Sequence, residues 1–217
     1  MNRAVEDYLK IIYKLTFEKD KNLAKVSEVA KELKFTEQTT NEMIKKLALG
    51  KLVEYIPYKG VKLTKVGQKE AVRLIRAHRI IELFLSNTLK MNWQEVHHEA
   101  EKLEHAASEL VIDKLFEFLG NPKQCTHGNY IPNKDGSISK QILVKLTSLG
   151  NLERFKIIKV KDDSDLLAFL DSNQIKLNDT LKITKIDELN EIIFINVNKT
   201  TVAIGKRVSS LIYVIKV

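Results

Sequence analysis

The hydrophobic period of this 217-residue chain changes once, near residue 120, and few architectures are compatible with that change. Up to about Gly120, apolar residues recur at three- and four-residue spacing, as in amphipathic helices. After about Lys140, short apolar or alternating runs are separated by turn-like pairs such as Asn178-Asp179, which predicts a small antiparallel β barrel or sandwich. The intervening segment, 121–139, is rich in Asn, Gly, Pro and Lys and is predicted to be a linker. The fold class is therefore mainly α with small β parts.

The first part of the chain predicts three helices, of which the second and third are joined by a tight turn. Ser27 can cap the second helix and Thr36 the third, which Gly50 ends. Two apolar stretches on either side of residues 57–60 then predict a short hairpin. A tight helical pair followed by a hairpin is a winged helix-turn-helix, in which the second helix of the pair enters the major groove of DNA. Caps for three later helices are expected at Thr64, Asn92 and Ser108.

The third predicted helix has a polar face suited to DNA. If Thr40, Ile44 and Leu47 face inward, amide, hydroxyl and lysine side chains face outward, where they can read base edges or neutralise phosphates. The predicted DNA-contacting residues are Thr36, Gln38, Thr39, Asn41, Lys45, Lys46 and Lys59. The alternative is a polar face that is merely solvated. Charge favours DNA, because residues 1–90 hold 19 basic and 11 acidic residues whereas the remainder holds 17 of each.

Residues 96–105, VHHEAEKLEH, are the densest group of metal-ligating residue types in the chain. If one helix runs through His105, a carboxylate and imidazole cluster converges from one of its faces, and the preceding helix adds a second pair at i, i+4 spacing. The alternative is an exposed face of ion pairs. Clustered, partly buried carboxylates without a counter-ion would repel each other, so a divalent cation is predicted. The first group is Glu101, Glu104 and His105, and the second, on the preceding helix, is His78 and Glu82.

Other features bound the protein class. Cys125-Thr126-His127 in the linker is a weak metal signal by itself, because no further ligands follow at the spacing of a zinc site. A single cysteine excludes an internal disulfide, and no apolar run approaches the ~20 residues that cross a bilayer. A cytoplasmic protein without a membrane partner is expected.

Three segments carry a family resemblance: Glu6-Asp7-Tyr8-Leu9 with Ile12-Tyr13, then Ala77-His78-Arg79-Ile80-Ile81-Glu82, then residues 96–105. Over essentially its whole length the chain resembles the diphtheria-toxin-repressor family of metal-dependent transcriptional repressors, and most closely its manganese-responsive branch. The resemblance implies a winged helix-turn-helix DNA-binding domain (1–72), a helical metal-binding and dimerisation domain with the linker (73–140) and an SH3-like β domain (141–217).

The resemblance also implies two metal sites. The primary site matches Asp7, His78, Glu101, Glu104 and His105, and the secondary site matches Glu82, Cys125, His127 and Asp162. Iron-responsive members have Met and Cys at the places of Asp7 and Glu101, so the oxygen-rich set here favours Mn(II), with Fe(II) as the alternative. His97, a ligand in iron-type members, is an alternative ligand. Lys10 stands where short manganese regulators have a bridging Glu, so two separate sites are expected rather than a binuclear pair.

The implied function is a homodimeric repressor that binds a palindromic operator when metal is present and controls metal-uptake genes. Without metal, the carboxylates are expected to repel and leave the DNA-binding domain loosely oriented. The chain is not expected to be an enzyme. Two alternatives are a metal-independent winged-helix DNA-binding protein and a metal-dependent hydrolase that uses Glu101 or Glu104 as a base.

Overall fold

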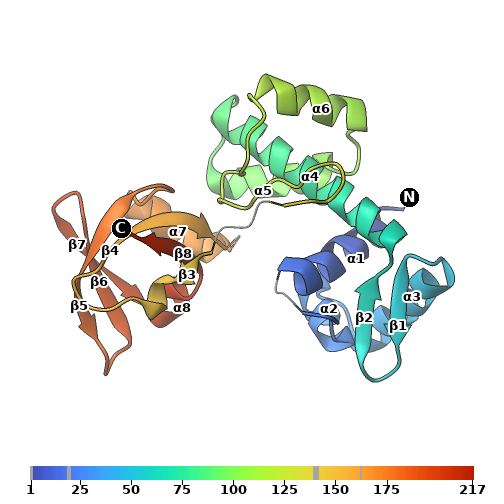
Figure 1. Ribbon diagram of the computed structural model, residues 1–217, viewed down its shortest axis with the longest axis horizontal. Coiled ribbons are helices and arrows are strands. Elements are labelled where there is room, and N and C mark those ends of the chain that lie inside the picture. Colours follow the sequence, from blue (N-terminus) through green and yellow to red (C-terminus); the bar gives the residue numbers. More distant parts are fainter. Residues whose placement is uncertain (1, 19–20, 139–141, 162) are drawn as a thin grey trace. The chain divides into compact units, whose positions relative to one another are not determined.

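The computed structural model describes residues 2–18, 21–138, 142–161 and 163–217 (Figure 1). The chain divides into two compact units. The N-terminal unit comprises Met1–Ile81, Ala100–Phe118 and Ile131–Ile138, and the C-terminal unit comprises Glu82–Glu99, Leu119–Tyr130 and Ser139–Val217. The predicted fold class, mainly helical with a winged helix-turn-helix and a separate β part, is confirmed. Among the described residues, no helix has the length and apolar character needed to cross a membrane.

The winged helix-turn-helix consists of three helices and a two-stranded hairpin. Their bounds are α1 Arg3–Tyr13, the π-helical turn η1 Lys14–Glu18, α2 Val26–Leu33, α3 Glu37–Leu49, β1 Val53–Ile56 and β2 Gly60–Leu63. Thr36 caps α3 by accepting a hydrogen bond from the Thr39 backbone N–H (3.2 Å), as predicted. Lys34, in the left-handed conformation, ends α2 and forms the tight turn. Leu9 and Ile12 of α1 pack with Ile44 and Leu47 of α3 in one core, which fixes α1 against the paired helices.

The expected cap of α2 is wrong by two residues. The helix begins at Val26, so Ser27 lies inside its first turn. Glu28 explains the shift, because its carboxylate accepts the backbone N–H of Lys25 (3.0 Å) and lets the helix begin two residues earlier than a Ser27 cap would.

Three longer helices follow the hairpin: α4 Lys65–Asn87, α5 Trp93–Leu103 and α6 Glu109–Phe118. Thr64, Asn92 and Ser108 accept backbone N–H groups at their starts (3.1, 2.9 and 3.3 Å), so the predicted caps are confirmed. The predicted end of α5 is wrong, because the helix stops at Leu103 and a turn contains Glu104 and His105. These two residues are therefore presented by a turn and not by a helical face.

The β part is one six-stranded antiparallel sheet with strand order β3-β8-β4-β5-β6-β7. Its strands are β3 Val144–Lys145, β4 Arg154–Val160, β5 Thr180–Asp187, β6 Ile192–Val197, β7 Thr200–Gly205 and β8 Ile212–Lys216, and its short helices are η2 Leu146–Ser148, α7 Ser164–Ser172 and α8 Lys206–Ser209. Phe155, Ile183 and Ile195 form a core with Leu166 and Leu170 of α7. The linker segment is tied to this sheet, because the Val160 N–H donates to the His127 carbonyl (3.0 Å).

Candidate metal centre

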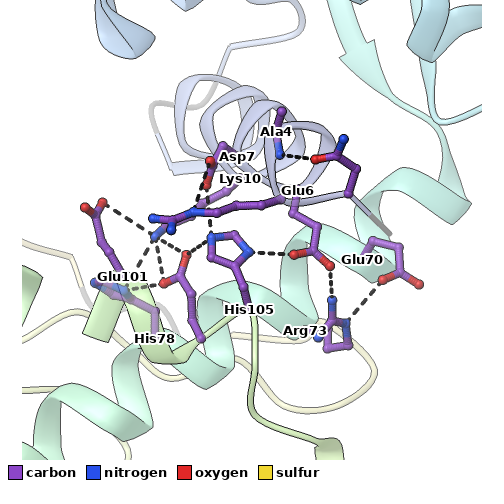
Figure 2. Close-up of polar contacts among 12 residues, drawn as sticks. Ala4, Glu6, Asp7, Lys10, Glu70, Arg73, His78, Glu101 and His105 are labelled. Carbon is purple, nitrogen blue, oxygen red and sulfur yellow. Dashed lines mark hydrogen bonds and ion pairs between the residues drawn. The ribbon is translucent and has the colours of Figure 1, made fainter. Parts of the chain in front are cut away.

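A cluster of predicted ligands forms inside the N-terminal unit (Figure 2). Asp7 comes from α1, and Glu104 and His105 come from the turn after α5; one ligand atom of each lies within 4.8 Å of the others. The Nε2 atom of His105 is 3.1 Å from an Asp7 oxygen and 3.4 Å from a Glu104 oxygen. Two carboxylates and one imidazole at this spacing fit a hard divalent ion such as Mn²⁺ better than a soft one.

His78 and Glu101 complete the predicted primary set unequally. His78, buried on α4, has its Nδ1 atom 2.5 Å from a Glu104 oxygen, so it belongs to the cluster. Glu101 on α5 lies at the edge, with its side chain 44% exposed and one oxygen 4.0 Å from the Lys10 ammonium. The structure thus brings four of the five residues into direct contact, and Glu101 approaches them through Lys10.

Lys10 on α1 is the residue whose role the sequence analysis did not anticipate. Its Nζ atom donates to both oxygens of Glu104 (2.7 and 2.8 Å) and lies 3.5 Å from the His78 Nδ1 atom. Both side chains of this ion pair are buried, at 5% and 0% exposure. The expectation that these carboxylates lack any counter-charge in the absence of metal is therefore wrong, because a lysine supplies one.

Charge and burial act on these groups in opposite directions. Burial alone would raise the pKa of Glu104, but its contacts with His78 and Lys10 outweigh burial and hold the pKa below its usual range. Burial, together with the charge of Lys14, lowers the pKa of Lys10, whereas Glu104 opposes the change. Burial raises the pKa of Asp7 despite its cationic neighbours. Glu104 is therefore ionised at neutral pH, the state that a metal ligand requires.

Glu6 is a further site residue that sequence reasoning missed. One of its oxygens is 2.5 Å from the Nδ1 atom of His105, and the other accepts a hydrogen bond from Arg73 (2.8 Å), which also donates to Glu70 (3.2 Å). A carboxylate on one ring nitrogen of a ligating histidine orients the other nitrogen toward the ion. Here that other nitrogen, Nε2, faces Asp7 (Figure 2). It also lies 3.4 Å from a Glu104 oxygen. Only the adjacency of Glu6 to Asp7 hinted at this role.

A second cluster lies in the C-terminal unit. Glu82, Cys125 and His127 are all buried, and one ligand atom of each lies within 4.8 Å of the others. The Glu82 Oε1 atom is 3.3 Å from His127 Nδ1 and 3.4 Å from His97 Nδ1. Asp162, the fourth predicted ligand, lies outside the described residues.

His127 has a strongly shifted pKa. Burial lowers it, but the contacts with Cys125 and Glu82 outweigh burial and raise the pKa to about 10. An imidazolium cannot bind a metal ion, so His127 must release its proton before it can act as a ligand. This cluster therefore groups a nitrogen, an oxygen and a sulfur atom, and its nitrogen can bind an ion only after His127 loses a proton.

The predicted DNA-contacting residues lie on α3 and the wing. Gln38, Lys45 and Lys46 are exposed and Asn41 is half-buried, while Thr40, Ile44 and Leu47 are buried as the sequence analysis expected. Thr36 and Thr39 are exposed at the start of α3, where their hydroxyl groups hydrogen-bond each other (2.9 Å). Lys59 is exposed at the turn of the hairpin.

Three family models match successive parts of the chain. Residues 1–61 match the iron dependent repressor N-terminal DNA binding domain, residues 64–133 match the iron dependent repressor metal binding and dimerisation domain, and residues 144–216 match the FeoA domain. The chain is 30% identical to an iron-dependent repressor, IdeR, of Mycobacterium leprae over 76% of both chains. It is 32% identical to an HTH-type transcriptional regulator, MntR, of Geobacillus thermodenitrificans over 54% of this chain and 80% of that one.

Solved structures agree over nearly the full length. The structure of the manganese regulator SloR has 34% identity and a TM-score of 0.78, with 98% of both chains covered. A manganese-dependent transcriptional repressor in complex with manganese has 29% identity and a TM-score of 0.86, with 98% of this chain and 100% of that chain covered.

Proposed function

The chain belongs to the iron-dependent repressor family, and we propose that within this family it is a DNA-binding transcriptional repressor activated by Mn(II), with Fe(II) as the alternative ion. The observation that carries the proposal is the convergence of Asp7, Glu104 and His105 beside a winged helix-turn-helix in one compact unit. The oxygen-rich donor set supports Mn(II). We also propose the domain bounds 1–72, 73–140 and 141–217; the three family models support the order of three domains, with the second match beginning at residue 64.

The proposed primary ligands are Asp7, His78, Glu101, Glu104 and His105. A bound Mn²⁺ would supply a double positive charge that favours a close arrangement of these groups. Asp7 is carried by α1, which packs against the DNA-reading helix pair, whereas the other ligands are carried by α4, α5 and the turn after α5. Drawing them together fixes α1, and with it α3, relative to the helices that follow the wing.

The proposed secondary ligands are Glu82, Cys125, His127 and Asp162. The contacts of Glu82 with both His127 and His97 support a ligand role for Glu82, and they keep His97 as an alternative fourth donor. Because the His127 carbonyl is bonded to β4, occupancy of this site would couple the linker segment to the sheet.

The proposed DNA complex is a homodimer on a palindromic operator, as the match to a dimerisation domain supports. Exposed apolar side chains on α6, among them Leu110 (69% exposed) and Phe118 (68%), support a role for this helix in subunit contact. Two symmetry-related α3 helices would then reach two half-sites, about one helical turn apart. Thr36, Gln38, Thr39, Asn41, Lys45, Lys46 and Lys59 are the proposed DNA contacts.

We also propose that the chain is not an enzyme. Glu104, the strongest candidate for a catalytic base, is fully buried and bonded to Lys10 and His78, so a substrate has no access to it.

The test is a fluorescence anisotropy titration on a duplex selected from a random pool by the Mn(II)-loaded protein. We expect the affinity for this duplex to be at least roughly tenfold higher with Mn(II) than with chelator, a typical allosteric coupling. The Glu104→Ala variant should lose this difference but keep weak, salt-sensitive DNA binding. Equal affinities of the wild-type protein with Mn(II) and with chelator would overturn the proposal.

A further inference from the structure

We infer that Lys10 is a tethered cation that holds the primary site in the metal-free protein and competes with the incoming ion, so that it sets the Mn(II) concentration to which the protein responds. The inference rests on the proposed function, because it takes His78 and Glu104 as ligands.

The first support is geometric. The Lys10 ammonium donates to both oxygens of Glu104, at 2.7 and 2.8 Å, and lies 3.5 Å from the ring nitrogen of His78 and 4.0 Å from an oxygen of Glu101. All three neighbours are proposed ligands, and no other lysine or arginine among the described residues has a recorded ion pair with Glu104. Figure 2 shows the Lys10 side chain extending from α1 into this group.

The second support is steric and electrostatic exclusion. Divalent ions bind carboxylate oxygens at roughly 2.0–2.6 Å, closer than the ammonium now lies. If an ion bound Glu104 at that distance, the ion and the Lys10 ammonium would be two positive charges beside the same buried carboxylate, where water screens their repulsion little. Lys10 must therefore leave Glu104 when an ion binds there. Its flexible four-carbon stem allows the ammonium to move without a shift of α1.

The consequence is that a higher Mn(II) concentration is needed to fill the site. When a site is closed most of the time, its apparent affinity for the ion equals its intrinsic affinity multiplied by the fraction of molecules in which the site is open. Each contact between Lys10 and Glu104 lowers the open fraction, so the lysine weakens metal binding while it stabilises the metal-free protein. A neutral side chain of similar length at position 10 would remove the free-energy cost of breaking the Lys10 contact with Glu104 and leave the proposed ligands unchanged.

The test is isothermal titration calorimetry of MnCl₂ into the full chain, compared among the wild type, Lys10→Met and Lys14→Met. Lys14 is the matched control, since it carries the same charge one turn further along the chain and has no recorded bond to Glu104. We expect Lys10→Met to lower the Mn(II) Kd by roughly ten- to hundredfold, the value of a charged hydrogen bond, and Lys14→Met to change it by less than about threefold.

Equal or weaker Mn(II) binding by a folded Lys10→Met variant, as judged by circular dichroism, would overturn the inference and leave the proposed function intact. Absence of Mn(II) binding in the wild type would instead defeat the proposed function itself. A second measurement on the wild type does not depend on folding of the variant. The side-chain ¹⁵N resonance of Lys10 should shift on titration with Zn²⁺ as a diamagnetic probe, and an unchanged resonance at saturation contradicts displacement.

Discussion

Glu104 holds three groups of the N-terminal unit together, because its two oxygens contact Lys10, His78 and His105 at once. A carboxylate in such a position has two roles. It is a ligand when a metal ion is bound, and it is the partner of a buried ammonium when none is. The second role makes Glu104 important for stability as well as for metal response, and the two effects can be measured separately.

Glu104→Gln should lower the free energy of unfolding of the metal-free protein by about 2–4 kcal/mol, because the substitution leaves the buried Lys10 ammonium without an ionised partner. The matched variant Glu101→Gln, at a side chain that is 44% exposed, should cost less than about 1 kcal/mol. Denaturant unfolding in chelator measures both values. If the two variants lost the same free energy of unfolding, the Lys10 contact with Glu104 would contribute no more to stability than an exposed carboxylate does.

The pKa of His127 predicts how stability depends on pH. Because this pKa is raised to about 10 in the folded protein, from an ordinary value of 6.5, the folded state binds one more proton than the unfolded state between these limits. The stabilisation is complete below about pH 6.5 and is lost as the pH rises toward 10. Without metal, the free energy of unfolding should therefore fall with rising pH by up to about 1.4 kcal/mol per unit.

Thermal unfolding in chelator across this pH range provides the measurement, with His127→Gln as the reference. The wild-type protein should lose stability more steeply than the variant as the pH rises. Parallel curves for the two proteins would contradict the pKa assignment.

At the scale of elements, local sequence signals predicted most helix starts and the hairpin of the wing, but not the end of α5. Thr36, Thr64, Asn92 and Ser108 are caps, since one side chain and one nearby N–H determine a cap. The end of α5 at Leu103 has no such local signal. The turn before β7, Asn198-Lys199, likewise has positive φ at both residues but lacks the glycine that usually marks such a hairpin.

Gly67, in the first turn of α4, gives a test of packing between two elements. A Cβ atom at this position would overlap the carbonyl oxygen of Leu52, the same oxygen that accepts the N–H of Thr64 (3.1 Å). Gly67→Ala should therefore lower the free energy of unfolding by about 2–3 kcal/mol. Gly50→Ala is the control, because its Cβ would meet backbone oxygens at an ordinary 3.5 Å and its φ is −74°. Similar denaturation midpoints for the two variants would show that α4 can shift away from Leu52.

At the scale of the whole molecule, the ligands come from positions far apart in the chain. Lys10 and Glu104 are separated by 94 residues, and Glu6 and His105 by 99. Helical spacing cannot predict such pairs, so the joint ligand set followed from the family resemblance. The resemblance did not include the ion pair of Lys10 or the Glu6 to Arg73 contact, because both depend on the packing of α1 in this chain. For the β part, the structure can be compared only with the fold prediction, since the proposed ligand from this part, Asp162, lies outside the described residues.

The central claim is that Asp7, His78, Glu101, Glu104 and His105 hold one Mn(II) ion that connects α1 to the helices after the wing. The most direct measurement is a crystal structure of the Mn(II)-loaded chain with anomalous scattering at the manganese edge. We predict an anomalous peak within bonding distance of Glu104 and His105 Nε2, roughly 2.0–2.6 Å, with the Lys10 ammonium withdrawn from Glu104. A Mn(II)-saturated crystal without a peak at this position, and with Lys10 still bonded to both Glu104 oxygens, would contradict the account.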